Sequence, residues 1–274
     1  MTEYDSLPCY EYSAEKCLTA RLEKNRLKNR YSNILAQDPT LVRLSTGEYI
    51  NANFIRLAPD RPRAIACQGP KDNTVSDFWR MVYESRAESI CMLTDTHEVT
   101  RGYVAEKCYR YWPDVGTGVL YDKFYIRSES EIEIIPGLTA TSVSIMPTEL
   151  TKLMPDDMVR YPVGSAPDWS IKVHNIRLYR MTSWADTSIP DSDTPINILV
   201  GLLSTEKAPI VIHCSAGVGR TGTLAAILKC KWSGIDPFSA VSQLRQERHG
   251  MVYNREQYDY VKQYHSMYII TQGM

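Results

Sequence analysis

The sequence lacks any apolar run of the roughly 20 residues that a helix needs to cross a membrane. It also lacks a recognisable signal peptide, because residues 1–5 are polar and acidic. We therefore expect a cytoplasmic protein, or the excised domain of a larger one.

Net charge and paired cysteines are also scarce. The 31 basic residues nearly balance the 32 acidic ones, which leaves a formal net charge of −1. Such a balance gives no electrostatic footprint for nucleic acid or for an anionic membrane surface. The seven cysteines are scattered, without the spacing typical of a disulfide framework or a zinc site. We expect no metal and no nucleic-acid partner, and nothing in the sequence indicates an oligomeric state.

The chain is long enough for a sizeable core, with 274 residues of which 43% are hydrophobic. Apolar periodicity predicts helices over 11–30, 77–85, 195–203, 220–232, 237–248 and 254–270, and strands over 89–93, within 103–146 and over 171–179. Four prolines in 147–170 predict a loop, and 127–170 is a candidate insertion. The element order favours an α/β (α+β) fold in a single domain over 1–274, with a central mixed sheet flanked by helices.

One short run carries most of the chemistry. It follows the apolar residues 210–212 and reads His213, Cys214, Ser215, Ala216, Gly217, Val218, Gly219, Arg220 and Thr221. A tight loop from a strand into a helix points successive main-chain N–H groups into one space, at the positive end of the helix dipole. Small residues let a phosphoryl group approach the backbone closely, and a guanidinium can bind two of its oxygens. We expect Cys214 to be a thiolate at neutral pH, because such a setting favours the charged form of a thiol.

A buried structural cysteine beside a turn is the alternative reading of Cys214. The joint presence of the histidine, the glycines, the arginine and the threonine after a strand argues against it. A nucleotide P-loop is excluded, because the run lacks the Gly-Lys-Ser/Thr ending.

The chain resembles the tyrosine-specific branch of the protein tyrosine phosphatase family, whose signature is His-Cys-(X)5-Arg-(Ser/Thr). The resemblance runs from about Asn25 to Tyr264. It covers further family blocks in the family's order: Lys28–Ile34, Glu48–Ile55, Cys67–Pro70, Asp77–Val82, Lys107–Pro113, Trp184–Asp186 and Gln257–Tyr258. It implies a phosphatase-like fold with a highly twisted sheet, catalysis by a cysteine nucleophile, and no cofactor or metal.

Two Trp-X-Asp segments compete for the role of the family's general acid. Trp112-Pro113-Asp114 has the usual Trp-Pro-Asp letters, but it ends a block that is structural in the family. Trp184-Ala185-Asp186 has the right place in the order, although Ala185 replaces a proline and Ser188 a glycine. The resemblance therefore assigns the acid to Asp186, and the two replacements predict altered loop closure.

The resemblance assigns the remaining site residues. It implies that Tyr31 forms an aromatic wall of a deep pocket and that Asn33 contacts the backbone of the substrate. Gln257 matches the second water-positioning glutamine, whereas Tyr253 replaces the first, which predicts slow hydrolysis of the phosphoenzyme. The supporting contacts implied are Thr221 to the leaving thiolate, His213 to Tyr111, Lys107 to Asp186, and Glu98 or its rival Glu106 to Arg220. Arg245 and Arg248 match structural arginines.

These residues predict a protein tyrosine phosphatase that acts on phosphotyrosine-containing proteins in signalling through a phosphocysteine. Ala185 and Tyr253 leave open a phosphotyrosine-binding pseudophosphatase with weak or no turnover. A dual-specificity or phosphoinositide phosphatase is a third possibility, although Ser215–Gly219 lacks the lysine common in lipid-directed members.

Overall fold

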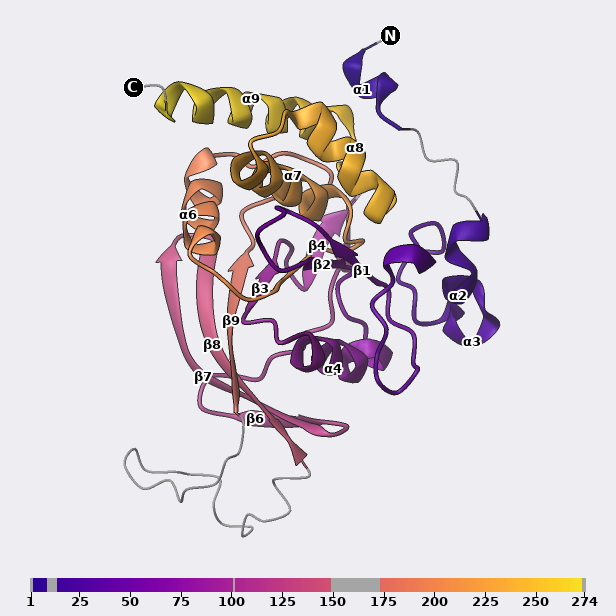
Figure 1. Ribbon diagram of the computed structural model, residues 1–274. Helices are drawn as coiled ribbons and strands as arrows, with labels where there is room; N and C mark the ends of the chain where they lie inside the picture. The colour runs from indigo at the N-terminus through magenta and orange to yellow at the C-terminus, as the bar shows by residue number, and fades with distance from the viewer. Residues whose placement is uncertain (1, 9–13, 101, 149–172, 273–274) are drawn as a thin grey trace.

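A mixed sheet of eight strands forms the centre of the molecule (Figure 1). The computed structural model describes residues 2–8, 14–100, 102–148 and 173–272. In spatial order the strands are β1 (Ala52–Ile55), β2 (Ala64–Cys67), β10 (Ile210–His213), β3 (Ser89–Met92), β9 (His174–Met181), β8 (Leu138–Pro147), β7 (Phe124–Ile135) and β6 (Gly118–Tyr121). A separate hairpin pairs β4 (His97–Thr100) with β5 (Tyr103–Glu106).

The central strands β2, β10, β3 and β9 run parallel, and the flanking pairs are antiparallel. Parallel strands buried on both faces read as continuous apolar runs, which explains Ile210-Val211-Ile212. Loops that leave the carboxyl ends of parallel strands meet at one edge of the sheet, where ligands commonly bind. The run that follows β10 leaves the sheet at this edge.

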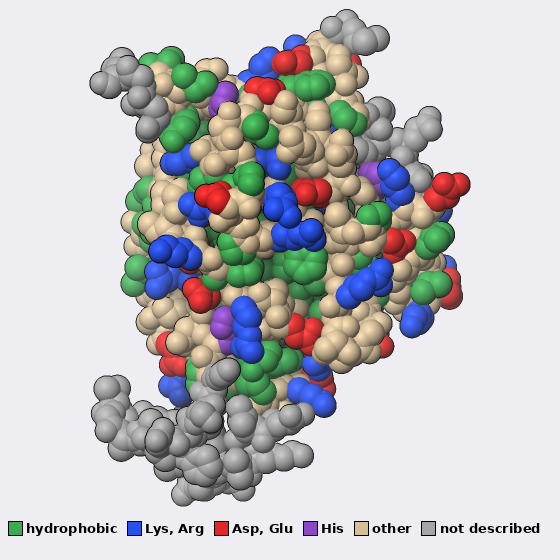
Figure 2. Space-filling model, viewed as in Figure 1, with side chains coloured by type: hydrophobic (Ala, Val, Ile, Leu, Met, Phe, Trp, Pro, Cys, Tyr) green, Lys and Arg blue, Asp and Glu red, His purple; other side chains and the backbone are tan. Residues whose placement is uncertain are grey.

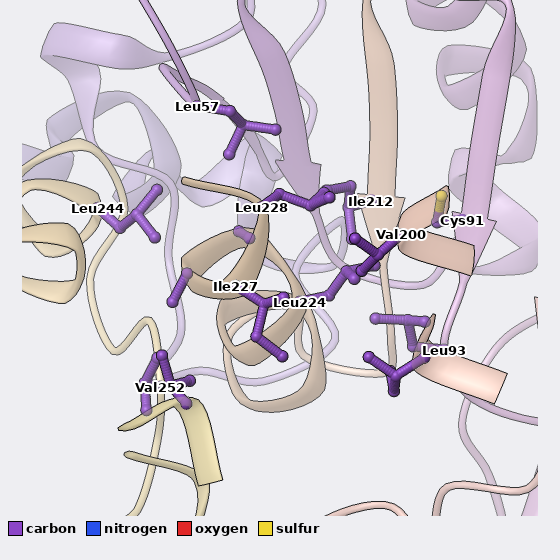
Figure 3. Packing of buried hydrophobic residues seen from close by; sticks show 14 of the residues in the cluster. Leu57, Cys91, Leu93, Val200, Ile212, Leu224, Ile227, Leu228, Leu244 and Val252 are labelled. Carbon is purple, nitrogen blue, oxygen red and sulfur yellow. The ribbon is translucent and has the colours of Figure 1, made fainter. Parts of the chain in front are cut away.

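Helices cover both faces of the sheet (Figure 1). One face packs against α6 (Asp193–Ser204), α7 (Gly219–Ser233), α8 (Pro237–Glu247) and α9 (Arg255–Gln272). The other face packs against α4 (Val75–Ser85). Strand β10 joins the two cores, because Ile210 and Ile212 belong to the first and Val211 to the second. Figure 3 shows the first core, where Leu224, Ile227 and Leu228 of α7 meet side chains from neighbouring elements.

The predicted amphipathic helix over 11–30 is wrong in its described part. Residues 14–30 form only single turns: η1 (Ala14–Cys17), α2 (Leu18–Arg21) and α3 (Glu23–Arg26). The chain leaves helical geometry at Leu22, whose ψ is 137°. The leucines of the expected apolar stripe are exposed, Leu18 by 64% and Leu27 by 72%. Small residues are buried in their place, including Cys17 and Ala20.

The other described elements match the expectation within a few residues. Helices α4, α6, α7, α8 and α9 and strands β3 and β9 lie where apolar periodicity placed them. Residues 103–147 contain β5, β6, β7 and β8, and the last three join the central sheet. Most of the predicted proline-rich loop, and part of the candidate insertion over 127–170, fall outside the described residues.

The remaining elements are short. They are α1 (Glu3–Ser6), η2 (Asp38–Thr40) and η3 (Asp72–Thr74). No helix in the described ranges is both long and apolar enough to cross a membrane. Figure 2 shows basic and acidic side chains interspersed on the visible face, in keeping with the balanced composition.

Candidate active site

Cys214 lies in the loop that joins β10 to α7. Its side chain is nearly buried, with 4% of the residue exposed. The main-chain N–H of Gly217 donates a hydrogen bond to Sγ over 3.3 Å. The start of α7 follows at Gly219, so the sulfur lies near the positive end of a helix of 15 residues.

The carbonyl groups of this loop are held by groups behind it. Gly69 N–H donates to the carbonyl of Ser215 over 2.9 Å. Arg248 donates to the carbonyl of Ala216 over 3.1 Å and to that of Gly217 over 2.8 Å. These contacts fix the orientation of three successive peptide units.

The N–H groups of the same loop are left for a ligand. Among the described residues we find no hydrogen bond from the main-chain N–H of Ser215, Ala216 or Val218. The N–H groups in the first turn of α7 have no partner within the helix. We call residues 214–220 the cradle. Donors that converge in this way suit an oxyanion.

Gly217 permits the close approach that shapes the cradle. Its φ is +74°, and a Cβ atom there would lie 2.0 Å from the carbonyl oxygen of Cys67. No side chain fits in that space, so the cradle requires glycine for both conformation and contact.

Arg248 supports the cradle from a fully buried position. In addition to the two carbonyls, its guanidinium donates to Asn53 over 2.8 Å and to Asn51 over 2.9 Å. Burial lowers the pKa of Arg248 below its ordinary value. Four hydrogen bonds therefore stabilise a cation that would otherwise be costly to bury. The prediction named Arg248 as structural, and this network specifies what it holds.

Arg220 is 2% exposed, and acidic groups hold its guanidinium. Nη1 donates to Glu98 over 2.6 Å and to the carbonyl of Trp184 over 2.7 Å. Nη2 lies 3.3 Å from Oδ1 of Asp186. Burial opposes its charge, but the charges of Cys214, Glu98 and Asp186 raise the pKa of Arg220 overall. In the described part of the chain no hydrogen bond involves Nε, which leaves this donor for a ligand.

The two rivals for the partner of Arg220 are separated by the structure. Glu98, on β4, forms the ion pair with Arg220. Glu106 instead pairs with Arg30 over 3.2 Å. Thr94, which the sequence reading did not single out, donates to Glu98 over 2.7 Å and accepts from Arg220 over 3.2 Å. Thr94 thus fixes both members of the pair.

Asp186 lies on a loop over the cradle, where two cations hold it. Its Oδ2 accepts a hydrogen bond from Nζ of Lys107 over 2.7 Å, and Oδ1 faces Arg220. Burial alone would raise the pKa of Asp186, but the hydrogen bond from Lys107 and the charges of Arg220 and Lys107 lower it overall. The same pair raises the pKa of Lys107, against the effect of burial. Without substrate, this geometry favours the carboxylate form.

Asp114, of the competing Trp-Pro-Asp segment, is not among these groups. Its side chain is 76% exposed and pairs with Arg110. The neighbouring Trp112 is buried in the core that packs against α4. Of the two competing aspartates, the structure places only Asp186 beside Arg220.

His213 and Tyr111 form the expected contact behind Cys214. Nε2 of His213 lies 2.8 Å from the Tyr111 hydroxyl, and Nδ1 lies 3.2 Å from the carbonyl oxygen of Cys214. A carbonyl only accepts, so we assign the proton to Nδ1, and Tyr111 then donates to Nε2. Burial lowers the pKa of His213 to about 4, which keeps the ring neutral near pH 7.

Tyr31 lies at the rim of the cradle. Its hydroxyl is 2.9 Å from the hydroxyl of Ser215, which fixes the ring beside the loop that bears Cys214. Asn33, two residues further along, is exposed. This placement is compatible with an aromatic wall at Tyr31 and a peptide contact at Asn33.

Gln257 is buried beside the cradle, and both ends of its amide already have partners. Nε2 donates to the carbonyl of Ser188 over 3.2 Å, and Oε1 accepts from the N–H of Tyr253 over 3.1 Å. The side chain of Tyr253 is largely exposed, with 55% of the residue accessible. Neither side chain forms a direct bond to Cys214.

Thr221 departs from the expectation. Its hydroxyl is buried and has no hydrogen-bond partner among the described residues, so the bond to the Cys214 sulfur is not present in this state. The hydroxyl remains available as a donor at the start of α7.

Asn254 was missed altogether. Its Nδ2 donates to the carbonyl of Thr187, on the loop that bears Asp186, over 2.7 Å. The only signal in the sequence was an asparagine at the first position of the helix predicted over 254–270, a pattern that indicates a helix cap rather than a contact to a distant loop.

Comparison with known proteins places the chain in a family. The profile of the protein-tyrosine phosphatase family matches residues 25–267. The chain belongs to this family, and the strand-to-helix cradle around Cys214 lies inside the match.

The relatives include several receptor-type enzymes. The chain is 34% identical to the receptor-type tyrosine-protein phosphatase eta of Gallus gallus over 95% of its own length and 18% of that protein. It is 37% identical to the receptor-type tyrosine-protein phosphatase epsilon of Rattus norvegicus, over 95% of the chain and 36% of that protein. It is 32% identical to the receptor-type tyrosine-protein phosphatase alpha of Homo sapiens, over 95% of the chain and 32% of that protein. The chain thus spans roughly a fifth to a third of these relatives.

Within residues 2–8, 14–100, 102–148 and 173–272, no three or more histidine, cysteine, aspartate or glutamate side chains cluster in a way that suits a metal ion.

Proposed function

We propose that this domain hydrolyses phosphotyrosine in proteins through a phosphocysteine intermediate. The observation that carries the proposal is the convergence of three groups. Cys214 lies at the base of a loop with inward donors, Arg220 is buried behind it, and Asp186 reaches Arg220 over 3.3 Å. A nucleophile, a charge clamp and a proton donor are what transfer of a phosphoryl group to sulfur requires.

In the first step the thiolate of Cys214 forms a bond to phosphorus as the bond from phosphorus to the tyrosyl oxygen breaks. The cradle N–H groups and Nε of Arg220 bind the non-bridging oxygens. Asp186 gives its proton to the departing tyrosyl oxygen, so that a neutral phenol leaves. General acid catalysis of this kind contributes about 10²–10⁴ in rate.

In the second step water attacks phosphorus and the bond from sulfur to phosphorus breaks. The carboxylate of Asp186 now takes the proton of that water, and Cys214 returns as the thiolate. Gln257 lies against Gly219 at the edge of the cradle, where a Cβ atom on the glycine would be 3.2 Å from Nε2. We assign the water to Gln257, which would have to exchange its bond to Ser188 for one to the water.

The ion pairs of the free domain explain how Asp186 can become an acid. A phosphoryl dianion in the cradle competes with Asp186 for Arg220 and adds negative charge nearby. Both effects favour the neutral form of a carboxyl group. Substrate binding therefore raises the pKa of Asp186 and favours the protonated form that the first step needs.

Selection of phosphotyrosine rests on Tyr31. Its hydroxyl contact to Ser215 holds an aromatic ring beside the cradle, where it can stack on the ring of a bound phosphotyrosine. Phosphoserine is too short to place its phosphoryl group in the cradle while it engages such a wall. Asn33 lies on the exposed side, where the backbone of a substrate peptide would pass.

The direct test compares phosphotyrosyl, phosphoseryl and phosphoinositide substrates with the purified domain. We expect turnover of the phosphotyrosyl peptide only, and none with Cys214→Ser. Binding of the phosphotyrosyl peptide without turnover would identify a pseudophosphatase. Preference for the phosphoseryl peptide or the inositide would overturn the assignment of substrate.

The redox chemistry of the thiol favours the cytoplasm as the place of action, in signalling through phosphotyrosine. A nucleophilic thiolate requires a reducing compartment, and the six cysteines of the described residues are all free. Activity should persist in a glutathione buffer poised at the cytosolic potential. Loss of activity in that buffer, restored by a stronger reductant, would contradict this placement.

A further inference from the structure

The start of α9 forms hydrogen bonds to the loop that bears Asp186. We call Trp184–Pro190 the acid loop. Asn254 donates to the carbonyl of Thr187 over 2.7 Å, and Gln257 to that of Ser188 over 3.2 Å. These two residues are 67 and 69 positions away from their partners, so both contacts depend on the fold.

The contact of Asn254 falls on the most unusual residue of the loop. Thr187 has a φ of +57°, in the left-handed region. A β-branched side chain is rarely found there, because Cβ and its substituents crowd the backbone. The main-chain N–H of Thr187 also donates to Oδ1 of Asp186 over 3.1 Å. The strained turn at Thr187 therefore helps to aim the carboxyl group.

The same asparagine directly precedes α9 and caps it. Its Oδ1 accepts a hydrogen bond from the main-chain N–H of Gln257 over 2.9 Å, as a helix cap does. Both ends of one short amide are thus in use, the oxygen for the helix and the nitrogen for the acid loop. The cap holds the amide in place, so the donor is aimed at Thr187 in advance.

We propose that Asn254 is a positioning residue for the proton-transfer step, and that it stabilises the strained turn that aims Asp186. The proposal rests on the proposed function, since it assumes that Asp186 is the acid. When Nδ2 of Asn254 no longer donates, the turn at Thr187 relaxes toward negative φ, and Asp186 withdraws from Lys107 and Arg220. Proton donation then slows, while the cradle and Cys214 are untouched.

The test separates two roles of Asn254: the helix cap, and the hydrogen bond from Nδ2 to the carbonyl of Thr187, which we call the latch. Serine at position 254 caps a helix well but is too short to reach Thr187, and aspartate caps but cannot donate. For both Asn254→Ser and Asn254→Asp we expect kcat/KM with phenyl phosphate, which reports the steps up to phenol release, to fall about five-fold, the value of one hydrogen bond. The kcat/KM with an aryl phosphate of a strongly acidic phenol should change little, because that phenolate leaves without a proton. Asn175→Ser, an exposed asparagine on β9, serves as the control.

A second readout does not depend on activity. Amide hydrogen exchange of residues 184–190 should quicken in both variants and stay unchanged in the control. A wild-type domain without phosphatase activity would contradict the proposed function, yet the exchange result would still test the latch. Equal losses of kcat/KM for both aryl phosphates, or unchanged exchange in the acid loop, would overturn the proposal.

The strain at Thr187 allows a reciprocal test. Asparagine tolerates the left-handed conformation better than threonine, so Thr187→Asn should relieve the strain. In the Asn254→Ser background it should restore part of the lost kcat/KM with phenyl phosphate and slow the exchange of 184–190. Strictly additive effects of the two substitutions would show that they do not act on one turn, and would overturn the proposal.

Discussion

The cradle and the acid loop hold the two halves of the proposed chemistry in different ways. The cradle is buried, its carbonyls are fixed from behind by Gly69 and Arg248, and Gly217 allows no other residue. The acid loop is anchored at its ends by the buried residues Trp184 and Pro190, but Asp186 between them is held by ion pairs, and its side chain is 33% exposed. A nucleophile site must be in place before substrate arrives, whereas the acid must change partners in every turnover. Rigid packing suits the first task and exchangeable contacts suit the second.

The largest effect is expected from removal of the acid. Asp186→Ala should lower kcat for a phosphotyrosyl peptide by about 10²–10⁴ and leave KM within a few-fold, because the cradle still binds the phosphoryl group. The matched control is Asp114→Ala, in the competing Trp-Pro-Asp segment, which should leave steady-state kinetics unchanged. Equal kcat for Asp186→Ala and the unmodified domain would contradict the assignment.

The rigidity of the cradle is tested by one methyl group. In Gly217→Ala the new Cβ collides with the carbonyl of Cys67, so the donors lose their alignment and kcat/KM should fall by on the order of 10²–10³. Gly47→Ala is a close control, since Gly47 has the same φ of +74° but nothing within 4 Å of the added atom. If both variants lose activity equally, left-handed strain and not the tight contact is responsible.

Tyr253 offers a smaller effect in the second step. With no glutamine at this position, hydrolysis of the phosphocysteine should be slow relative to its formation. Rapid mixing with an aryl phosphate should therefore give a burst of phenol before the steady state. Tyr253→Gln should shrink the burst and raise the steady-state rate a few-fold. A domain without a burst would show that the replaced glutamine does not limit turnover.

Replacement of Lys107 should shift the pH profile of kcat/KM more than it lowers the maximal rate. As an acid, Asp186 must be protonated, so kcat/KM falls as the pH rises above the pKa of Asp186 in the free enzyme. Lys107 lowers that pKa. Lys107→Met therefore raises it and moves the falling limb of the profile to higher pH. Lys262→Met, which removes a lysine that forms an ion pair with distant Glu3, should leave the limb in place. A limb that moves to lower pH would refute the pairing.

Sequence reasoning reached the cradle because its causes are local. An apolar strand, small residues and a helix follow one another without interruption, so spacing alone places Cys214 and Arg220 together. It failed for residues 14–30, where the helical spacing of Leu18, Leu22 and Leu27 predicts a buried stripe that the structure does not form. Asn25 there donates to the carbonyl of Thr19 over 2.8 Å, a local alternative to helical bonding that spacing does not reveal.

The contacts around the acid loop were harder to foresee for a different reason. The hydrogen bond from Asn254 to Thr187 joins distant segments. The local sequence of a helix-capping asparagine is the same whether or not its Nδ2 donates to another loop. The expected pairs of Lys107 with Asp186 and of His213 with Tyr111 came from the family resemblance and not from spacing. Long-range contacts of this kind require the fold.

The most direct test of the central claim is to trap the covalent intermediate. The domain, slowed in hydrolysis by Gln257→Ala, would be mixed with a phosphotyrosyl peptide, quenched within the burst, digested and analysed by mass spectrometry. We predict one added phosphoryl group, on the peptide that contains Cys214 and on its sulfur. Release of phosphate at the full rate with that peptide unmodified, or a phosphoryl group on another residue, would contradict the account.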